Sequence, residues 1–159
     1  MPDYVYLSQE GYDRILKELE DLKHIKRPEI SKKIAEARAF GDLKENAEYH
    51  AAKELQAVTE AKILQLEQTL SRAKILKKED MAVDKVTILS RVKLKDLNRN
   101  LEMEYTLVSP QESDSRENKI STASPVGKAL LGRKIGDVVE IRVPAGLLKY
   151  QVMDLKLSI

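Results

Sequence analysis

The sequence predicts an α+β protein, with an N-terminal antiparallel α-helical coiled-coil hairpin followed by a C-terminal antiparallel sheet with one short helix. Gly41 is the only glycine between Gly11 and Gly127, and long runs of helix-forming residues flank it on both sides. Because glycine adopts backbone angles that a helix interior excludes, it indicates a tight reversal between two helices. Beyond about residue 83 the apolar residues change from helical spacing to alternation, which is typical of half-buried strands.

The apolar residues of the two predicted helices mirror one another about this reversal. Spacings of three and four residues are typical of a coiled-coil seam, and residues equally far from the reversal are expected to face each other. The expected pairs are Tyr12 with Leu76, Ile15 with Ala73, Leu19 with Leu70, Leu22 with Leu66, Ile25 with Ile63, Ile30 with Val58 and Ile34 with Leu55. This register places the reversal between Ala39 and Asn46, at the end of a rod whose arms, at ~1.5 Å per residue, are roughly 45 Å long.

The limits of the two helices follow from local signals. Ser8 is suited to cap the first helix, which we expect to run to about Ala39. Pro28 lies inside that helix, where proline removes a hydrogen bond and clashes with the preceding turn, so a kink or short break is expected from Lys26 to Pro28. The second helix is expected to run to about Lys77.

The rest of the chain predicts a small domain of strands. The expected divisions are a hairpin at residues 1–78, a linker at 79–83 and a second domain at 84–159. Alternating apolar residues predict strands near residues 86–95, 101–107, 138–143 and 148–157, with a mobile loop from Pro110 to Lys119. A short helix is expected after Ser124, because serine suits the N-cap, Pro125 the first helical position and Gly132 the end.

Composition excludes several classes of function. The chain has 159 residues and no cysteine, which excludes disulfides and thiolate-ligated metal sites. Its net charge is only +2 although 34% of its residues are charged, which argues against a protein that holds duplex DNA by itself. Because no secretory signal or membrane-spanning run is visible, we expect a cytoplasmic protein without a membrane partner. We also expect it to be a monomer.

Two interpretations are open for Asp42 and Glu45 at the predicted tip. An acidic N-cap with a glutamate three residues later is a capping-box pattern, and both carboxylates favour the positive end of a helix dipole. Alternatively, they are functional groups that reach into a partner, because they stand at the far end of the predicted rod. For Lys44 a salt bridge and a phosphate contact are equally open, whereas Tyr49 is expected to be a packing residue. His24 and His50 are expected to be solvated or packed and not to bind metal.

Two motifs resemble those of a known family. Gly41 to Lys53 closely resembles the tip motif of bacterial Gre-type transcript cleavage factors, in particular the GreA branch, and Ser124 to Asp137 resembles the family's second motif. The resemblance covers the whole chain. It implies a transcription elongation factor that binds RNA polymerase, inserts its hairpin into the secondary channel and stimulates the polymerase's Mg²⁺-dependent cleavage of backtracked nascent RNA, which rescues arrested complexes. It also implies a C-terminal domain that is similar to the FK506-binding-protein fold and docks on the polymerase.

The resemblance implies roles for individual residues. By motif position, Asp42 and Glu45 would be the catalytic acidic pair that helps to hold a Mg²⁺ ion shared with RNA polymerase. Arg38 and Lys53 match basic positions near the tip, and the resemblance implies that they face RNA. The protein would then be no enzyme itself, but would activate the RNA cleavage activity of the polymerase in trans.

The second motif is expected to serve docking, at Ser124 and Pro125. Two other classes of function compete with the one implied: a non-catalytic rod, either a channel-plugging inhibitor or a scaffold, and prolyl isomerisation by the second domain. The intact Asp42 and Glu45 pair disfavours a scaffold, which would not need it. Isomerisation is disfavoured because it uses an aromatic-lined pocket, and the second domain has few aromatic residues.

Overall fold

The structure is a computed structural model that describes residues 3–42 and 45–159. The chain forms two compact units. Glu10–Ala73 makes up most of the first, and Val5–Gln9 joins Lys74–Ile159 in the second. No helix within the described ranges is long and apolar enough to cross a bilayer.

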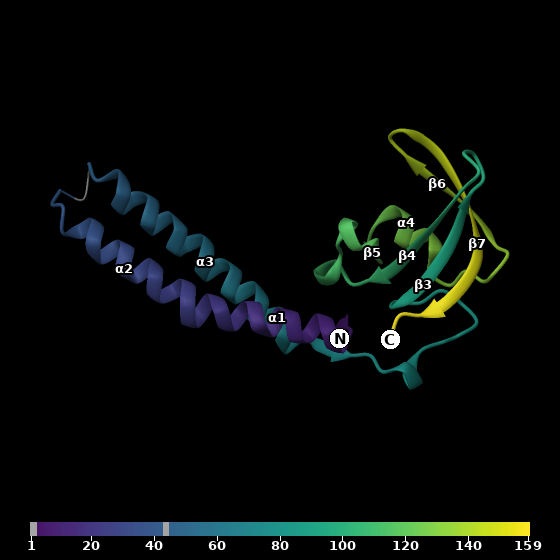
Figure 1. The fold of residues 1–159 in the computed structure, drawn as a ribbon, viewed down its shortest axis with the longest axis horizontal. Coiled ribbons are helices and arrows are strands. Elements are labelled where there is room, and N and C mark those ends of the chain that lie inside the picture. The colour runs from purple at the N-terminus through teal and green to yellow at the C-terminus, as the bar shows by residue number, and fades with distance from the viewer. Residues whose placement is uncertain (1–2, 43–44) are drawn as a thin grey trace. The chain divides into compact units, whose positions relative to one another are not determined.

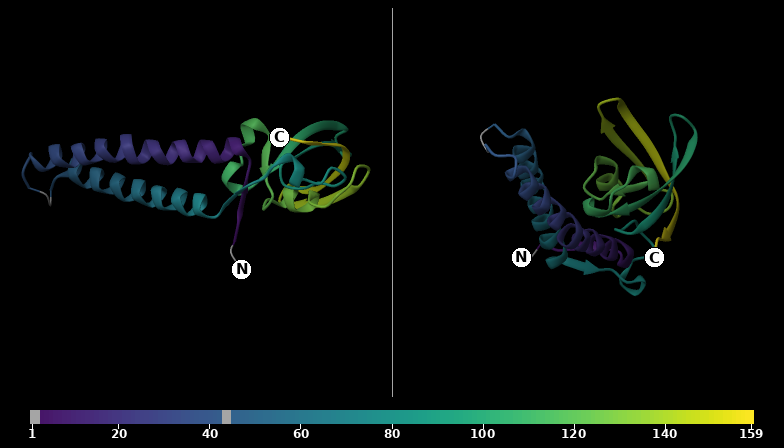
Figure 2. Two further views of the ribbon diagram at one scale, coloured as in Figure 1. Left: turned by 90° about the horizontal axis from the view of Figure 1, so that it is seen from below. Right: turned by 60° about the vertical axis from the view of Figure 1, so that its left-hand side comes forward.

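The first unit is the predicted antiparallel helical hairpin. Its first arm consists of α1 (Gln9–Asp21), the π-helix η1 (Leu22–Lys26) and α2 (Arg27–Arg38), and its second arm is α3 (Ala47–Ser71). Both η1 and α2 contact α3, which runs back beside the first arm in Figures 1 and 2. The helical hairpin and the α+β class are therefore confirmed.

The expected break at Pro28 is instead a change of helix type. The backbone N–H of Arg27 donates to the carbonyl oxygen of Leu22, five residues earlier, and Pro28 falls in the first turn of α2. Proline cannot donate to the carbonyl four residues earlier, and its ring clashes with that carbonyl in a regular α-helix. A π-turn placed just before the proline thus lets the arm continue without the predicted break.

The seam between the arms differs from the predicted one in the half nearer the tip, which we call the distal half. Ile63 is buried as expected, but Ile25 is 51% and Val58 is 62% exposed, so these two residues were wrongly assigned. Five residues turn an α-helix through roughly 500°, which places Val58 about 140° away from the face that holds Ile63. Thr59, four residues from Ile63, is buried in its place.

The distal core is small. Ile30 and Ile34 of α2 pack in one cluster with Ala52 of α3, and Tyr49 covers its edge. Tyr49 is therefore the packing residue that was expected. Leu55, the predicted partner of Ile34, is 42% exposed and is not a member of this cluster.

Ion pairs fix the relative height of the two arms. Arg27 forms hydrogen-bonded contacts of 2.8 and 2.9 Å with Glu60, and the Lys23 Nζ atom lies 2.6 Å from Glu67 Oε1. The hydrogen bond from Arg27 lowers the pKa of the Glu60 carboxyl below its ordinary value. These pairs lie close to the heights that the mirrored register predicts, so the error in the seam concerns which faces of the arms are buried and not their relative height.

The second arm ends earlier than expected, at Ser71 rather than near Lys77. Ala73–Ile75 forms β2, which pairs with β1 (Val5–Leu7) in a two-stranded sheet. A helix cannot continue through residues whose backbone groups bond to another strand. The second helix therefore does not include Ala73 or Leu76, which the mirrored register had placed in it.

The second unit contains a five-stranded curled sheet with the order β5-β4-β3-β7-β6 (Figure 1). Its strands are β3 (Ser90–Asp96), β4 (Leu101–Val108), β5 (Lys119–Ser121), β6 (Val138–Val143) and β7 (Gly146–Leu157). All neighbouring pairs are antiparallel except β4 and β5, which are parallel. The helix α4 (Pro125–Leu130) contributes Leu130 to the core beneath the sheet. The likeness to the FK506-binding-protein fold stays a prediction.

Two segments of this unit differ from expectation. Strand β3 begins at Ser90 and not near residue 86, because Leu89 adopts a left-handed backbone with φ of 68° and is buried in the core. The expected mobile loop at residues 110–119 holds two 3₁₀ turns and the start of β5. Glu112 is only 6% exposed there and accepts hydrogen bonds from the backbone and hydroxyl groups of Ser8.

Candidate functional site

The tip of the hairpin starts where α2 ends. Backbone N–H groups of Phe40 and Gly41 donate to the carbonyl oxygens of Ala37 and Arg38, which closes the last turn. Gly41 then adopts φ of 108°, a region that favours glycine because it has no Cβ. The predicted role of Gly41 as the helix terminator is thereby confirmed.

Asn46 organises the other side of the tip. Its side-chain Oδ1 accepts a hydrogen bond of 3.0 Å from the backbone N–H of Tyr49, so Asn46 is the N-cap of α3. Its Nδ2 donates to the carbonyl oxygen of Ala37, 2.6 Å away, at the end of α2. One side chain therefore begins the second helix and joins it to the first.

This arrangement excludes one of the two interpretations of the acidic pair. Because α3 starts at Ala47 with Asn46 as its N-cap, Asp42 is not an N-cap and Glu45 precedes the helix. The capping-box interpretation is therefore wrong. Both acidic residues are exposed. They line one hollow of about 400 Å³, the acidic hollow, together with Phe40, Asn46, Ala47 and Glu48.

The donor set of the acidic hollow fits Mg²⁺, which prefers carboxylate and other oxygen ligands. Two carboxylates supply only part of the near-octahedral shell, so the remaining ligands have to come from water, phosphate or a partner. Within the described residues no group of three or more His, Asp or Glu side chains is arranged to hold a metal ion. Lys44, for which a salt bridge and a phosphate contact were both open, lies outside the described residues.

The two basic residues assigned to RNA lie on different helices. The guanidinium carbon of Arg38 lies 5.8 Å from the ring centroid of Tyr49, a cation–π contact at the end of α2. Lys53 of α3 donates from Nζ to Gln56 at 3.1 Å. Both are exposed, and their role toward RNA stays a prediction.

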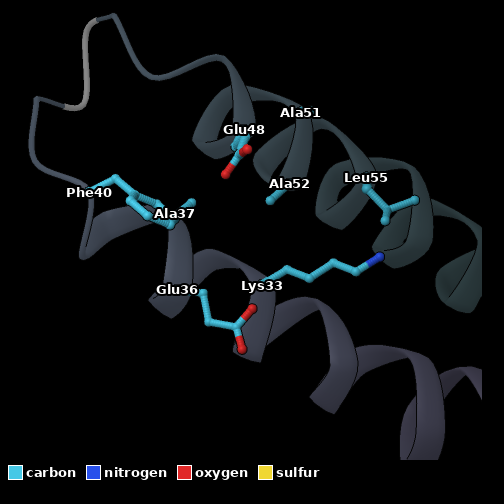
Figure 3. A pocket seen from close by; sticks show the side chains of 8 residues that line it. All are labelled: Lys33, Glu36, Ala37, Phe40, Glu48, Ala51, Ala52 and Leu55. Atoms are coloured by element: carbon cyan, nitrogen blue, oxygen red, sulfur yellow. The ribbon is translucent and has the colours of Figure 1, made fainter.

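A second depression, the apolar groove, lies between α2 and α3 just behind the tip. It has a volume of about 580 Å³ and is lined by Lys33, Glu36, Ala37, Phe40, Glu48, Ala51, Ala52 and Leu55. In Figure 3 the Phe40 ring lies beside Ala37, and Leu55 lies farther from the tip along α3. Phe40 and Glu48 line both the groove and the acidic hollow.

The residues assigned to docking lie at the start of α4. Ser124 is the N-cap: its Oγ accepts from the backbone N–H of Gly127 at 3.0 Å and donates to the carbonyl oxygen of Ser121 at 2.6 Å. Pro125 is the first helical residue and is exposed. The predicted serine cap and proline start are confirmed, whereas docking stays a prediction.

Sequence reasoning missed the surface around these two residues. Ser124 and Pro125 line a hollow of about 590 Å³, the C-terminal hollow, with Ser113, Asp114, Ser115, Lys119, Ile120, Ser121, Val126 and Val143. The parallel pairing of β4 with β5 contributes to this surface, and no local signal in the sequence predicts it. At Asp114, a hydrogen bond from the backbone N–H of Arg116 lowers the pKa of the carboxyl below its ordinary value, which favours its charged form.

Two family models match the chain. The one described as "Transcription elongation factor, N-terminal" matches residues 5–75, and the one described as "Transcription elongation factor, GreA/GreB, C-term" matches residues 81–157. Together they cover the helical hairpin and the curled sheet.

Relatives match over nearly the full length. A transcription elongation factor GreA of Chloroherpeton thalassium is 52% identical over 158 residues, which cover 99% of this chain and 100% of the relative. The protein of the same name from Chlorobium phaeovibrioides is 54% identical over 153 residues, 96% of each chain. Among solved structures, GreA factor homolog 1 (Gfh1) of Thermus thermophilus is 34% identical with a TM-score of 0.46, covering 97% of this chain and 99% of its own.

The helical hairpin with its acidic tip, the curled sheet with its capped short helix, and the two matched family models lead to one conclusion. The chain belongs to the GreA/GreB family of transcription elongation factors.

Proposed function

We propose that this protein binds RNA polymerase, places the hairpin tip in the secondary channel and stimulates the polymerase's own cleavage of backtracked nascent RNA. The observation that carries the proposal is the acidic hollow. Asp42 and Glu45 line it together, neither is the N-cap of α3, and both are exposed at the tip. Their carboxylates are therefore positioned to act on a partner.

The chemistry of the pair favours an activator over an independent enzyme. Two carboxylates on an exposed tip provide too few ligands for Mg²⁺ by themselves. Asp42 and Glu45 would help to hold a second Mg²⁺ ion beside one held by RNA polymerase, and such a pair of metal ions supplies water activation and stabilisation of the leaving oxygen in phosphodiester hydrolysis. Asp42 and Glu45 would contribute oxygen ligands to the second ion and accept hydrogen bonds that orient the water.

The other residues have supporting roles in this proposal. Arg38 and Lys53 provide positive charge near the tip, which would attract the phosphates of the RNA 3′ end. The second unit would hold the protein on the polymerase, through the C-terminal hollow around Ser124 and Pro125. That hollow offers both apolar and charged contacts, as protein interfaces do.

The experiment replaces Asp42 with Asn and Glu45 with Gln in one protein. Because Asn46 caps α3, the double variant should fold and bind polymerase nearly as well as the wild type. It should fail to stimulate cleavage, since a neutral amide is a much weaker Mg²⁺ ligand than a carboxylate. Stalled, backtracked polymerase complexes are incubated with each protein and Mg²⁺, and the length of the RNA is measured.

The single variants are the matched controls, because each retains one carboxylate and should be partly rescued by raised Mg²⁺. Thermal unfolding and competition with the wild-type protein for polymerase measure folding and binding separately. Stimulation by the double variant at the wild-type rate would show that the carboxylates are not metal ligands. A wild-type protein that binds the polymerase and only slows RNA synthesis would instead be a channel-plugging inhibitor, and the proposal would be wrong.

A further inference from the structure

Phe40 is the only phenylalanine in the chain, and its side chain is 76% exposed. It lies between the end of α2 and Gly41, in the short segment that also carries Asp42. Its backbone N–H donates to Ala37, so the position of its Cα is fixed by the last turn of the helix. An exposed aromatic ring on such a fixed backbone contributes little to the distal core, whose members are Ile30, Ile34, Ala52 and Tyr49.

The Phe40 side chain lines two adjacent surfaces, of which one is acidic and the other is mainly apolar. On one side it lines the acidic hollow with Asp42 and Glu45, and on the other it lines the apolar groove with Ala37 and Ala52 (Figure 3). A ligand that contacts both surfaces needs two groups. One is an anionic group that binds the carboxylates through a shared cation, and the other is a flat apolar group beside it. A nucleotide has both, since its phosphate binds cations and its base presents an aromatic face.

We propose that Phe40 positions the RNA for cleavage by stacking on the base of a nucleotide at the backtracked 3′ end. This inference rests on the proposed function and adds a positioning residue to it. The acidic side chains around the ring favour the base over the sugar-phosphate chain. Glu48 lines both surfaces and Glu36 lines the groove, so with Asp42 and Glu45 the two surfaces carry four carboxylates against one lysine, Lys33. This net negative charge repels phosphates that no cation neutralises. The uncharged base is thus the part of the RNA that the ring accepts.

Stacking on an aromatic ring tolerates any base, because every base has a π face. The contact would therefore suit a factor that acts on transcripts of any sequence. An apolar surface of the polymerase is the alternative occupant of the ring. The base is favoured because Phe40 lines the same hollow as Asp42 and Glu45. A nucleotide whose phosphate lies near those carboxylates also has its base close to the Phe40 ring.

The test compares Phe40→Leu, which retains an apolar side chain, with Phe40→Trp, which retains a stacking ring. Backtracked complexes are prepared with RNA that ends either in an ordinary nucleotide or in an abasic one. On ordinary ends Phe40→Leu should cleave about tenfold more slowly, the effect expected for one lost base–aromatic stack, whereas Phe40→Trp should retain the wild-type rate. On abasic ends the wild-type protein should slow to the rate of Phe40→Leu.

A second readout does not depend on cleavage. A 5-iodouridine at the RNA 3′ end should crosslink to the hairpin at position 40 on irradiation, and Phe40→Leu should lose that crosslink. Val58→Ala is the matched control, because Val58 is exposed on α3 and lines neither the apolar groove nor the acidic hollow. It should leave both the rate and the crosslink unchanged.

Several results would overturn the proposal. The proposal is wrong if Phe40→Leu cleaves ordinary ends at the wild-type rate. It is also wrong if Phe40→Leu is slower than the wild type by the same factor on abasic ends as on ordinary ends, because the ring would then contact a polymerase surface and not a base. An unaltered crosslink in Phe40→Leu would also contradict it. The proposed function is judged separately: if the Asp42→Asn, Glu45→Gln double variant loses cleavage while Phe40→Leu does not change, the function stands and only the stacking contact falls.

Discussion

The side-chain Nδ2 of Asn46 lies 2.6 Å from the carbonyl oxygen of Ala37 and donates a hydrogen bond to it. The donor belongs to the N-cap of α3, and the acceptor lies in the last turn of α2. The same carbonyl oxygen accepts from the backbone N–H of Phe40, so the Asn46 side chain adds a second donor to the last turn of the helix. Asn46 thereby holds together the two helix ends that carry the acidic hollow.

The first prediction concerns Asn46→Asp. Aspartate is as good an N-cap as asparagine, so the bond from the Tyr49 N–H is retained. The carboxylate cannot donate to Ala37 and places two oxygens close together. We expect a loss of about 1 kcal/mol or more in the free energy of unfolding, measured by urea titration with circular dichroism. Asn46→Ala, which also loses the cap, should lose about 1 kcal/mol more. If Asn46→Asp is as stable as the wild type, the bond to Ala37 does not contribute.

The second prediction tests the seam of α3. The mirrored sequence pattern assigns Ile63 and Val58 equally to the seam, but Ile63 is 3% exposed and Val58 is 62% exposed. Ile63→Ala should lower the free energy of unfolding by about 2–5 kcal/mol, the usual cost of truncating a buried isoleucine. Val58→Ala should change it by less than about 0.5 kcal/mol, as for exposed sites generally. Urea titration measures both, and comparable losses at the two positions would support the sequence-based seam over the observed one.

The third prediction links the packing of α4 to polymerase binding. A Cβ at Gly127 would clash with the carbonyl oxygen of Ser121, which is also the acceptor for the Ser124 hydroxyl. Gly127→Ala should therefore cost about 1–3 kcal/mol in the free energy of unfolding and displace the Ser124 cap.

If the C-terminal hollow docks on the polymerase, Gly127→Ala should also compete more weakly with the wild-type protein for polymerase. Lys128→Ala is the matched control, because Lys128 is the next residue of α4 and is exposed. It should retain both stability and competition. A Gly127→Ala protein that is destabilised but competes fully would separate α4 from docking.

The sequence predicts the hairpin and most of the strands because their signals are local. Gly41 ends α2 through its own backbone freedom, and the Ser124 and Pro125 signal depends on hydrogen bonds within one turn of α4. Alternation likewise identifies the strand at residues 138–143 without reference to its partners. Each of these features requires only neighbours within a few positions along the chain.

The acidic pair shows how a local signal can mislead. Asp42 and Glu45 have the spacing of a capping box, and nothing in that spacing tells whether the helix starts there. Asn46, directly before the alanine-rich start of α3, is an equally good cap by residue type. Its second bond, to Ala37, exists only once the two arms lie together, and that bond accompanies the later helix start.

The sequence by itself determined the two-part organisation, the place of the reversal and the acidic residues at the tip, because these depend on residue type and short spacings. Only the tertiary structure decided which face of α3 is buried, where that helix begins and ends, and which residues share a hollow. The buried contact of Ser8 with Glu112 joins positions 104 residues apart. The hollows around Phe40 and Ser124 likewise join separate segments, and the packing of those segments, which no local spacing records, brings their side chains together.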